Sequence, residues 1–478
     1  MSTINLDQNG IDINGPEFNS ISHNLQSNIL KSHSRDHARL LFINFSTSKA
    51  GVSSWVNNFI SQTRFVISAM DQKIDSAQHA LNRAADNGIK SKTVANFYLT
   101  ASGYKHIERN VREFTDIGFD ENDDNDEEEN DGVTAGNNDF IRGMKSKKVN
   151  TNLNDPDPNE WEQEYNKDIH AMILLADDDA PTLDIEMGLI KTSLAGIAVI
   201  IKEEIGNNIV DIFGGKKRNI EHFGYADGIS QPTYFTGVPL TSPFELQPLN
   251  ILLVKDPFID NADYNYGSFL VFRKLEQDVE GFNNKVSELS AKLNLNANQQ
   301  GKMTKEDYAG ALAVGRFRDG TPLIKSDIPL DQAPAFNDFK YENTDRGAHK
   351  CPFHAHIRKT NPRGQGVLVS ERYITRRGIP YGQQNTNDKK GLLFMCFQSN
   401  LKRQFNFLQK AWANAPGFPP LRSKPGIDAL IGQGHDGGQS WPVEYGSNDE
   451  VNFDFSGFIK MKGGEYFFAP SIGFLKNI

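Results

Sequence analysis

The sequence contains few cysteines and no long hydrophobic run. Only two of its 478 residues are cysteines, Cys351 and Cys396, which excludes a disulfide scaffold and a four-cysteine zinc site and is typical of a reducing compartment. The longest apolar runs, such as Ile197–Ile201, are much shorter than the roughly 18 residues of a membrane span. The N-terminus lacks the apolar core of a secretory signal. We therefore expect a cytoplasmic protein with no membrane association.

An excess of basic residues is absent as well. The net charge is −10, which argues against nucleic-acid binding. Nine acidic residues lie within residues 120–131, DENDDNDEEEND, and the rest of the chain is close to neutral. Asp120, Asn122 and Asp124 have the spacing of calcium ligands in an EF-hand loop, but the glycine that such a loop needs at its sixth position is missing. We expect a solvated acidic loop, inserted at about residues 116–164, rather than a calcium site.

The length of the chain and its hydrophobic patterns indicate two domains. A chain of this size exceeds one ordinary core, and its 32 phenylalanines can fill two. Strand-like runs lie at 39–46, 96–101, 168–176, 209–213, 268–273, 366–373, 391–397 and 465–469. Helical patterns lie between them at 55–72, 104–114, 182–204, 276–293 and 401–412. The alternation predicts an α+β fold with antiparallel sheets in two domains, 1–236 and 237–478.

The first segment with unusual chemistry is Glu221–Pro232, which reads EHFGYADGISQP. Gly224 and Gly228 bracket Asp227 within it. A carboxylate between glycines can lie where the backbone approaches a ligand closely, because glycine has no side chain to obstruct that approach. The alternative is an ordinary turn in which the aspartate caps a neighbouring backbone group.

The second segment is His349–Arg363, which reads HKCPFHAHIRKTNPR. Cys351, His354 and His356 could bind zinc, but no second cysteine or histidine pair lies at the interval of a structural zinc site. Surface histidines beside a basic loop are the other interpretation. The segment taken alone leaves these alternatives open.

The two segments, with an arginine that follows them, supply the groups that peroxide cleavage on haem requires. A neutral imidazole can hold the iron, a separate acid–base group must carry a proton between the peroxide oxygens, and a cation stabilises the charge that develops. His356 and Asp227 are candidates for the first two tasks. Arg376, in RRGIPYG, is the candidate cation.

Three motifs resemble those of one family. GYADGISQP resembles the GXXDG motif of the dye-decolorising (DyP-type) haem peroxidases, followed by the ISQP of longer members. CPFHAHIRKTNPR resembles the proximal-histidine segment of that family, and RRGIPYG resembles its distal-arginine segment. The likeness extends from about residue 24 to the C-terminus and is that of a longer bacterial-type member.

The resemblance implies a fold and a haem site. The fold would be two ferredoxin-like domains with antiparallel sheets, and haem b would lie in the C-terminal domain. His356 would be the proximal ligand of the iron, Asp227 the distal acid–base group and Arg376 the distal arginine. Leu392 and Phe394 would form the apolar wall of the distal pocket, although both could be ordinary strand core. His354 departs from the family pattern, in which a small residue is frequent at that position.

Four further residues receive roles from the same resemblance. Asp428, in GIDALIGQ, would accept a hydrogen bond from the second nitrogen of His356, or it could cap a loop. Arg363 would pair with a haem propionate, unless the basic loop is simply solvated. Tyr381 and Trp412 would carry electrons from bulky substrates at the surface, although packing is an alternative for both.

The implied function is the reduction of hydrogen peroxide with one-electron oxidation of phenolic, dye-like or other donors through a ferryl intermediate. An ordinary aspartate pKa of about 3.9 favours activity at acidic pH. Two alternatives stay open: a protein that binds haem, stores it or removes its iron, and a haem-free acidic interaction protein. The chain could also assemble as a homo-oligomer.

Overall fold

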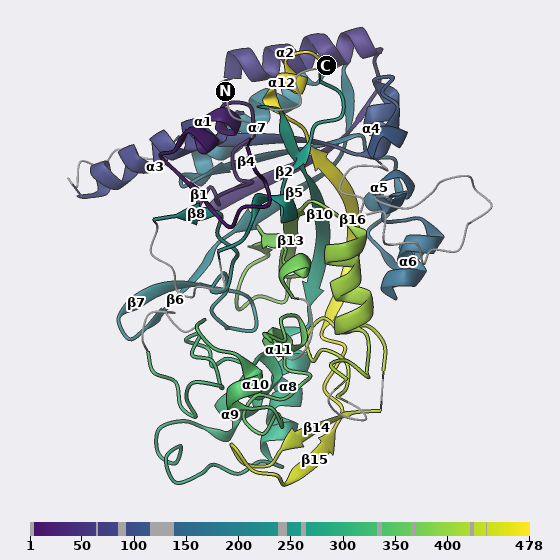
Figure 1. Cartoon of the computed structure of the whole chain (residues 1–478). Coiled ribbons are helices and arrows are strands. Elements are labelled where there is room, and N and C mark those ends of the chain that lie inside the picture. Colours follow the sequence, from purple (N-terminus) through teal and green to yellow (C-terminus); the bar gives the residue numbers. More distant parts are fainter. Residues whose placement is uncertain are drawn as a thin grey trace.

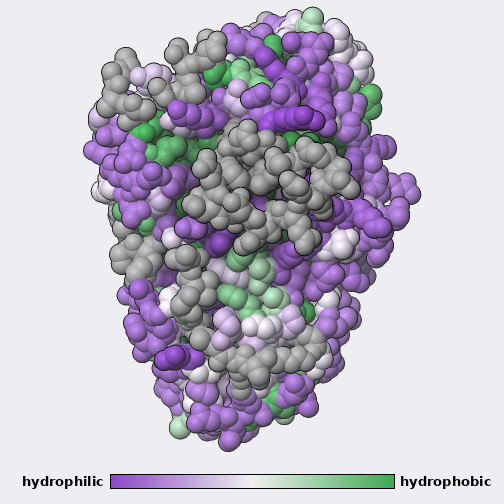
Figure 2. All heavy atoms as spheres, turned by 45° about the vertical axis from the view of Figure 1, so that its right-hand side comes forward, coloured by the Kyte–Doolittle hydropathy of each residue, from purple (hydrophilic) through white to green (hydrophobic). Residues whose placement is uncertain are grey.

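The structure is a computed structural model, and a large β-sheet runs through its centre (Figure 1). It describes residues 4–63, 66–84, 92–114, 138–237, 246–259, 264–331, 337–364, 369–420, 425–435 and 437–478. Helices α2, α3 and α7 lie at the end of the molecule that holds both chain termini, and α8–α11 lie at the opposite end. On the face drawn in Figure 2 the described surface is largely hydrophilic.

Among the described residues, ten strands form this sheet. The strands of the first half are β2 His37–Phe45, β3 Val94–Leu99, β4 Ala171–Asp177 and β5 Ala198–Asn207. The longer helices between them are α2 Lys49–Thr63, α3 Ala69–Ala84 and α7 Ala180–Ser193. The spatial order is β3-β4-β2-β5 with antiparallel neighbours. This is the strand order of a ferredoxin-like unit.

The second half repeats the arrangement. Its strands are β10 Tyr266–Gln277, β11 Thr375–Arg376, β12 Ile379–Tyr381, β13 Gly391–Gln398 and β16 Ile459–Ala469. The order is β11-β13-β10-β16, again antiparallel, and β16 meets β3 where Phe468 pairs with Leu99. The α+β fold with antiparallel, ferredoxin-like halves is therefore confirmed. A domain boundary near residue 236 stays a prediction.

The short strand Val254–Lys255 (β9) pairs with β10 as the tenth strand of the sheet, and the other remaining elements lie around the sheet. The helices are α1 Pro16–Ser22, α4 Ala101–His106, α5 Asn138–Arg142, α6 Lys147–Leu153, α8 Val279–Ser290, α9 Lys305–Val314, α10 Tyr341–Thr344, α11 His356–Lys359 and α12 Ile472–Leu475, with two wide-turn helices, η8 Lys402–Asn406 and η9 Leu408–Ala413. The short strands are β1 Ile11–Asp12, β6 Ile209–Phe213, β7 Lys216–Ile220, β8 Phe235–Thr236, β9 Val254–Lys255, β14 Gln439–Pro442 and β15 Glu450–Phe453. No helix in the described ranges is long and apolar enough to span a membrane.

Two sequence-based assignments were wrong in the type of element. The helix expected at 182–204 ends at Ser193, and β5 begins at Ala198. Gly196 adopts a left-handed φ of 73° between them, which breaks the helix, and the β-branched run after it favours a strand. The strand expected at 366–373 is a short 3₁₀ turn at Ser370–Arg372 in its described part.

The prediction of an inserted loop at 116–164 was also wrong for its second part. Residues 138–164 form helices that pack on the sheet, with Trp161 and Phe140 buried. Some polar residues of this part have buried partners instead of water: Asp155 forms an ion pair with Arg273 of β10. The acidic stretch 120–131 and its calcium alternative lie outside the described residues.

Replacing Asp155 with alanine should lower the free energy of unfolding by about 3–5 kcal/mol, because the buried Arg273 guanidinium would lose its counter-charge. Urea-induced unfolding measures the change. Glu288→Ala is the control, since Glu288 pairs with Lys285 at 2.7 Å on the surface, where an ion pair contributes about 0–1 kcal/mol. Equal effects of the two substitutions would contradict the prediction.

Candidate active site

A cavity of about 530 Å³ lies against the sheet of the second half and receives the loop that follows β7. Leu392 and Phe394 of β13 contribute to its wall, as the sequence predicts. They point to the same face as Leu275 and Arg273 of β10, which are their cross-strand partners and also line the cavity. Other apolar lining residues are Ile229, Val314, Ile357, Phe405, Leu408, Leu430, Ile431 and Ile459. The cavity therefore has an apolar wall and a few charged side chains beside it.

His356 begins α11 and lines the cavity, with 26% of its side chain exposed. Its Nδ1 lies 3.0 and 3.2 Å from the two carboxylate oxygens of Asp428, which is fully buried. The Asp428 carboxylate also accepts hydrogen bonds from the backbone N–H groups of Leu430 (2.8 Å) and Ile431 (2.9 Å). Burial raises the pKa of Asp428, but the imidazole of His356 and these N–H groups outweigh burial and hold the pKa below its ordinary value. Because Nδ1 faces the carboxylate, Nε2 is the nitrogen available to a ligand.

The other members of the zinc alternative do not join His356. His354 is buried, its Nδ1 faces the carbonyl oxygen of Pro425 at 3.3 Å, and its ring meets Trp441 edge-on. Cys351 is buried, and burial raises the pKa of its thiol to about 12. Within the described ranges, no three histidine, cysteine, aspartate or glutamate side chains gather to hold a metal ion. The zinc alternative is therefore not supported.

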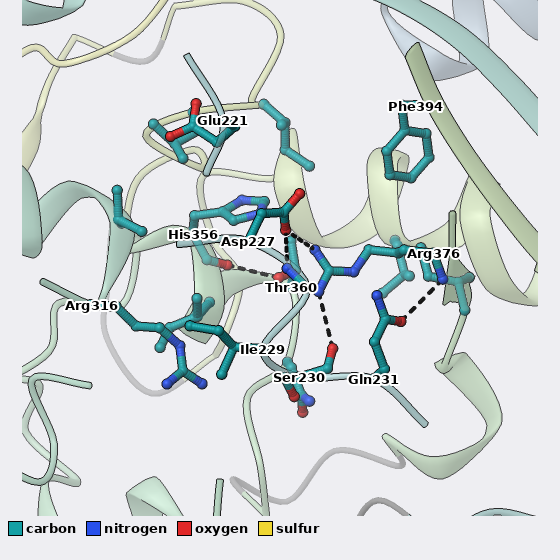
Figure 3. Close-up of a pocket in the computed structure, with 18 of the residues that line it drawn as sticks. Glu221, Asp227, Ile229, Ser230, Gln231, Arg316, His356, Thr360, Arg376 and Phe394 are labelled. Atoms are coloured by element: carbon teal, nitrogen blue, oxygen red, sulfur yellow. Dashed lines mark hydrogen bonds and ion pairs between the residues drawn. The ribbon is translucent and has the colours of Figure 1, made fainter. Parts of the chain in front are cut away.

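Asp227 lies in the loop that follows β7 and enters the same cavity (Figure 3). Its Oδ1 accepts a hydrogen bond from the N–H of Gly228 at 2.6 Å and faces the guanidinium of Arg376. Gly224 has a φ of 89°, and a Cβ at that position would lie 2.3 Å from Nη1 of Arg318. The left-handed backbone favours glycine there, and any larger residue would also have to displace the Arg318 guanidinium.

Arg376, in β11, brings a cation to Asp227. Its Nη1 lies 3.4 Å from Oδ1 of Asp227, and its Nη2 donates to the carbonyl oxygen of Ser230 at 3.0 Å (Figure 3). Arg377 instead donates to the carbonyl oxygens of Asn28 and Ile29 at 2.7 and 2.9 Å. Successive residues of a strand point to opposite faces, so the two arginines have different surroundings. The structure thus brings Arg376, and not Arg377, to the cavity.

Arg363 also lines the cavity. Its guanidinium donates to the carbonyl oxygen of Asn337 and to Ser230 Oγ at 3.1 Å, and it lies over the ring of Phe339. Arg316, which the sequence analysis missed, stands beside it: its Nη2 donates to Oδ1 of Asn337 at 2.7 Å. Burial, and then the charge of Arg363, lowers the pKa of Arg316 to about 10. No local signal in the sequence distinguishes Arg316, since its partner lies 21 residues away.

Tyr381 and Trp412 do not lie at the surface, which corrects their predicted surface position and agrees with the packing alternative. Tyr381 is 6% exposed and carries the ammonium of Lys274 over its ring at 4.8 Å. Trp412 is 1% exposed and stacks on Phe418. Neither is among the described residues that line the cavity. An exposed contact with substrate is excluded for both in this structure, while a role in internal electron transfer stays a prediction.

The residues of the cavity fit a haem group. Its volume is within the range of about 300–1,000 Å³ typical of cofactor sites. His356 offers a nitrogen fixed by a carboxylate on its other side, the wall is apolar, and Arg316 and Arg363 supply positive charge. This set suits an iron porphyrin that carries carboxylates.

Comparisons with known proteins show which family this chain belongs to. Residues 252–417 match the profile described as Dyp-type peroxidase, C-terminal. The Multifunctional dye peroxidase DyP2 of an Amycolatopsis species is 34% identical to this chain over 491 residues, which cover 95% of each protein. The chain belongs to the DyP-type peroxidase family. It is a dye-decolorising peroxidase, an oxidoreductase that acts on peroxide, and membership of the family implies a haem cofactor.

Solved structures of DyP-type peroxidases have the same fold over nearly the whole chain. A DyP-type peroxidase from an Anabaena species, AnaPX, superposes with a TM-score of 0.84 at 36% identity and covers 99% of this chain and 98% of its own. A dye-decolorizing peroxidase solved in complex with 2,6-dimethoxyphenol superposes with a TM-score of 0.73 at 27% identity and covers 95% and 98%. These likenesses confirm the fold class predicted from the sequence.

Proposed function

We propose that this DyP-type peroxidase binds haem b through Nε2 of His356, reduces hydrogen peroxide with Asp227 and Arg376, and oxidises phenolic and dye-like donors. The observation that carries the proposal is the pairing of Asp227 with Arg376 at 3.4 Å in the cavity that also holds the His356–Asp428 pair. When bound, haem supplies the redox-active iron at which the O–O bond of peroxide breaks.

Each side chain has one task in this proposal. His356 anchors the cofactor, and Asp428 accepts a hydrogen bond from Nδ1–H, which makes Nε2 a stronger electron donor. Asp227 takes the proton from one peroxide oxygen and delivers it to the departing oxygen. The guanidinium of Arg376 stabilises the negative charge that develops on the departing oxygen. Ser230 and Gln231 hold Arg376 in place through its Nη2 and backbone N–H.

The apolar wall limits what can reach the cofactor. Leu392 and Phe394 give the cavity an apolar wall beside the charged pair, and apolar surroundings strengthen the electrostatic effect of Arg376 on a reacting oxygen. Arg363 and Arg316 would hold the haem carboxylates by charge-assisted hydrogen bonds. The solved relative in complex with a phenol supports phenolic donors, and the two free, buried cysteines support a reducing, cytoplasmic location.

Rapid mixing of the haem-loaded protein with hydrogen peroxide tests the function. We expect a fast change of the Soret absorbance, followed by its return when a phenolic donor is added. A slow or absent change would favour the alternative of haem binding or storage, which needs His356 but not the paired Asp227 and Arg376. A protein that acquires no Soret band after haem supply would contradict both functions.

A further inference from the structure

A second carboxylate, that of Glu221, lines the same cavity and has no task in the chemistry above. Its Oε2 accepts hydrogen bonds from the backbone N–H of Phe223 at 2.8 Å and from the side-chain amide of Gln277 at 2.6 Å. Its Oε1 accepts from the backbone N–H of Tyr225 at 2.9 Å. Figure 3 shows the carboxylate turned away from Asp227 and His356. Its contacts therefore serve the loop rather than the reacting groups.

The loop that Glu221 holds is the one that carries Asp227. Its backbone also closes on itself, since Glu221 N–H donates to the carbonyl oxygen of Tyr225 at 3.1 Å and Gly224 N–H donates to that of Glu221 at 2.9 Å. Gln277 belongs to β10, which pairs with the strand that bears Leu392 and Phe394. The contact between Glu221 and Gln277 thus ties the Asp227 loop to the sheet that forms the cavity wall.

From these contacts we propose that Glu221 is a positioning residue of the peroxide reaction, which fixes loop 221–228 so that Asp227 stays beside Arg376. The inference rests on the proposed role of Asp227. A misplacement of about 1 Å in a reacting group can lower a rate by about 100-fold. Such a misplacement of Asp227 can arise in this loop. The loop runs from the short strand β7 to the cavity and is not itself a strand of the ten-stranded sheet.

The Glu221 carboxyl group suits this task in both of its protonation states. Burial raises its pKa to about 7, so it is protonated in mildly acidic solution. The protonated group still accepts from both backbone N–H groups. Its O–H can donate to Oε1 of Gln277, a buried oxygen with no hydrogen-bond partner, once the Gln277 amide turns over, since its Nε2 faces Glu221 in this structure. Glutamine cannot replace it, because an amide has only one accepting oxygen and its nitrogen accepts no hydrogen bond.

Glu221→Gln tests the proposal, and Glu465→Gln is the matched control. Glu465 is also buried and accepts from two backbone N–H groups, those of Met144 (2.9 Å) and Tyr466 (2.8 Å), but it does not line the cavity. In Glu221→Gln we expect faster amide hydrogen exchange over residues 219–230, with or without haem. We also expect kcat/KM for hydrogen peroxide to fall by about 10- to 100-fold, with KM for a phenolic donor unchanged. Gln277→Met should cause a smaller loss in the same direction.

Glu465→Gln should leave both measurements at the wild-type values. A wild-type peroxide rate in Glu221→Gln, or an equal loss in Glu465→Gln, would overturn the positioning role. The exchange measurement keeps the inference separate from the proposed function. If the wild-type protein proved not to be a peroxidase, unchanged exchange in Glu221→Gln would still refute the structural basis of the inference, and faster exchange would uphold it.

Discussion

Replacing Asp227 with asparagine is expected to slow the reaction of the haem-loaded protein with hydrogen peroxide by about 10²–10⁴-fold, which is the usual contribution of a positioned acid–base group. Asparagine keeps the size of the side chain and can still face Arg376, but it cannot take up the peroxide proton. The loss should therefore appear in the bimolecular rate with peroxide and not in haem content. Stopped-flow absorbance at mildly acidic pH measures that rate.

Asp388→Asn is the control for this experiment, since it makes the same chemical change in an exposed turn. It should react at the wild-type rate. A wild-type rate in Asp227→Asn would reduce Asp227 to a turn residue that caps the N–H of Gly228 at 2.6 Å. The haem-storage alternative would then become the better explanation of the cavity.

The sequence alone predicts the parts of the site that lie in short motifs. Asp227, His356 and Arg376 each stand in a segment of unusual composition, and the structure brings them, with Asp428, to one cavity and its immediate wall. The two halves of the fold are also predictable, because the alternating strand and helix patterns can be recognised in short stretches of the sequence. A functional residue whose motif spans about ten consecutive residues can therefore be predicted without a structure.

Features that depend on distant partners are not accessible in this way. Arg316 takes its partner from Asn337, and Glu221 takes one from Gln277, 56 residues further along. The boundary between α7 and β5 was missed because apolar residues on both sides of Gly196 continue a helical pattern. The sequence could not decide between a surface position and packing for Tyr381 for a similar reason, since the residues that cover it belong to other strands, including Lys274 of β10.

Replacing His356 with alanine is expected to remove the Soret band of the haem-loaded protein, or to weaken it strongly, because the iron would lose its protein ligand. Alanine also opens space next to the carboxylate of Asp428, which in the wild-type protein lies 3.0 Å from Nδ1 of the imidazole. Free imidazole can enter this space and bind both the carboxylate and the iron. Added imidazole should therefore restore haem binding, and absorbance titration with haem measures both effects.

His354→Ala is the matched control, because His354 lies two residues before His356 and is the other histidine that could hold the iron. It is 1% exposed, packs edge-on against Trp441 and does not line the cavity. Its loss should lower stability, through the cavity it leaves, without removing the Soret band, and imidazole should have no effect. If His354→Ala instead lost haem while His356→Ala retained it, the iron ligand would be His354. The hydrogen bond from His356 to Asp428 would then be a structural contact only, and the electron donation assigned to it would have no basis.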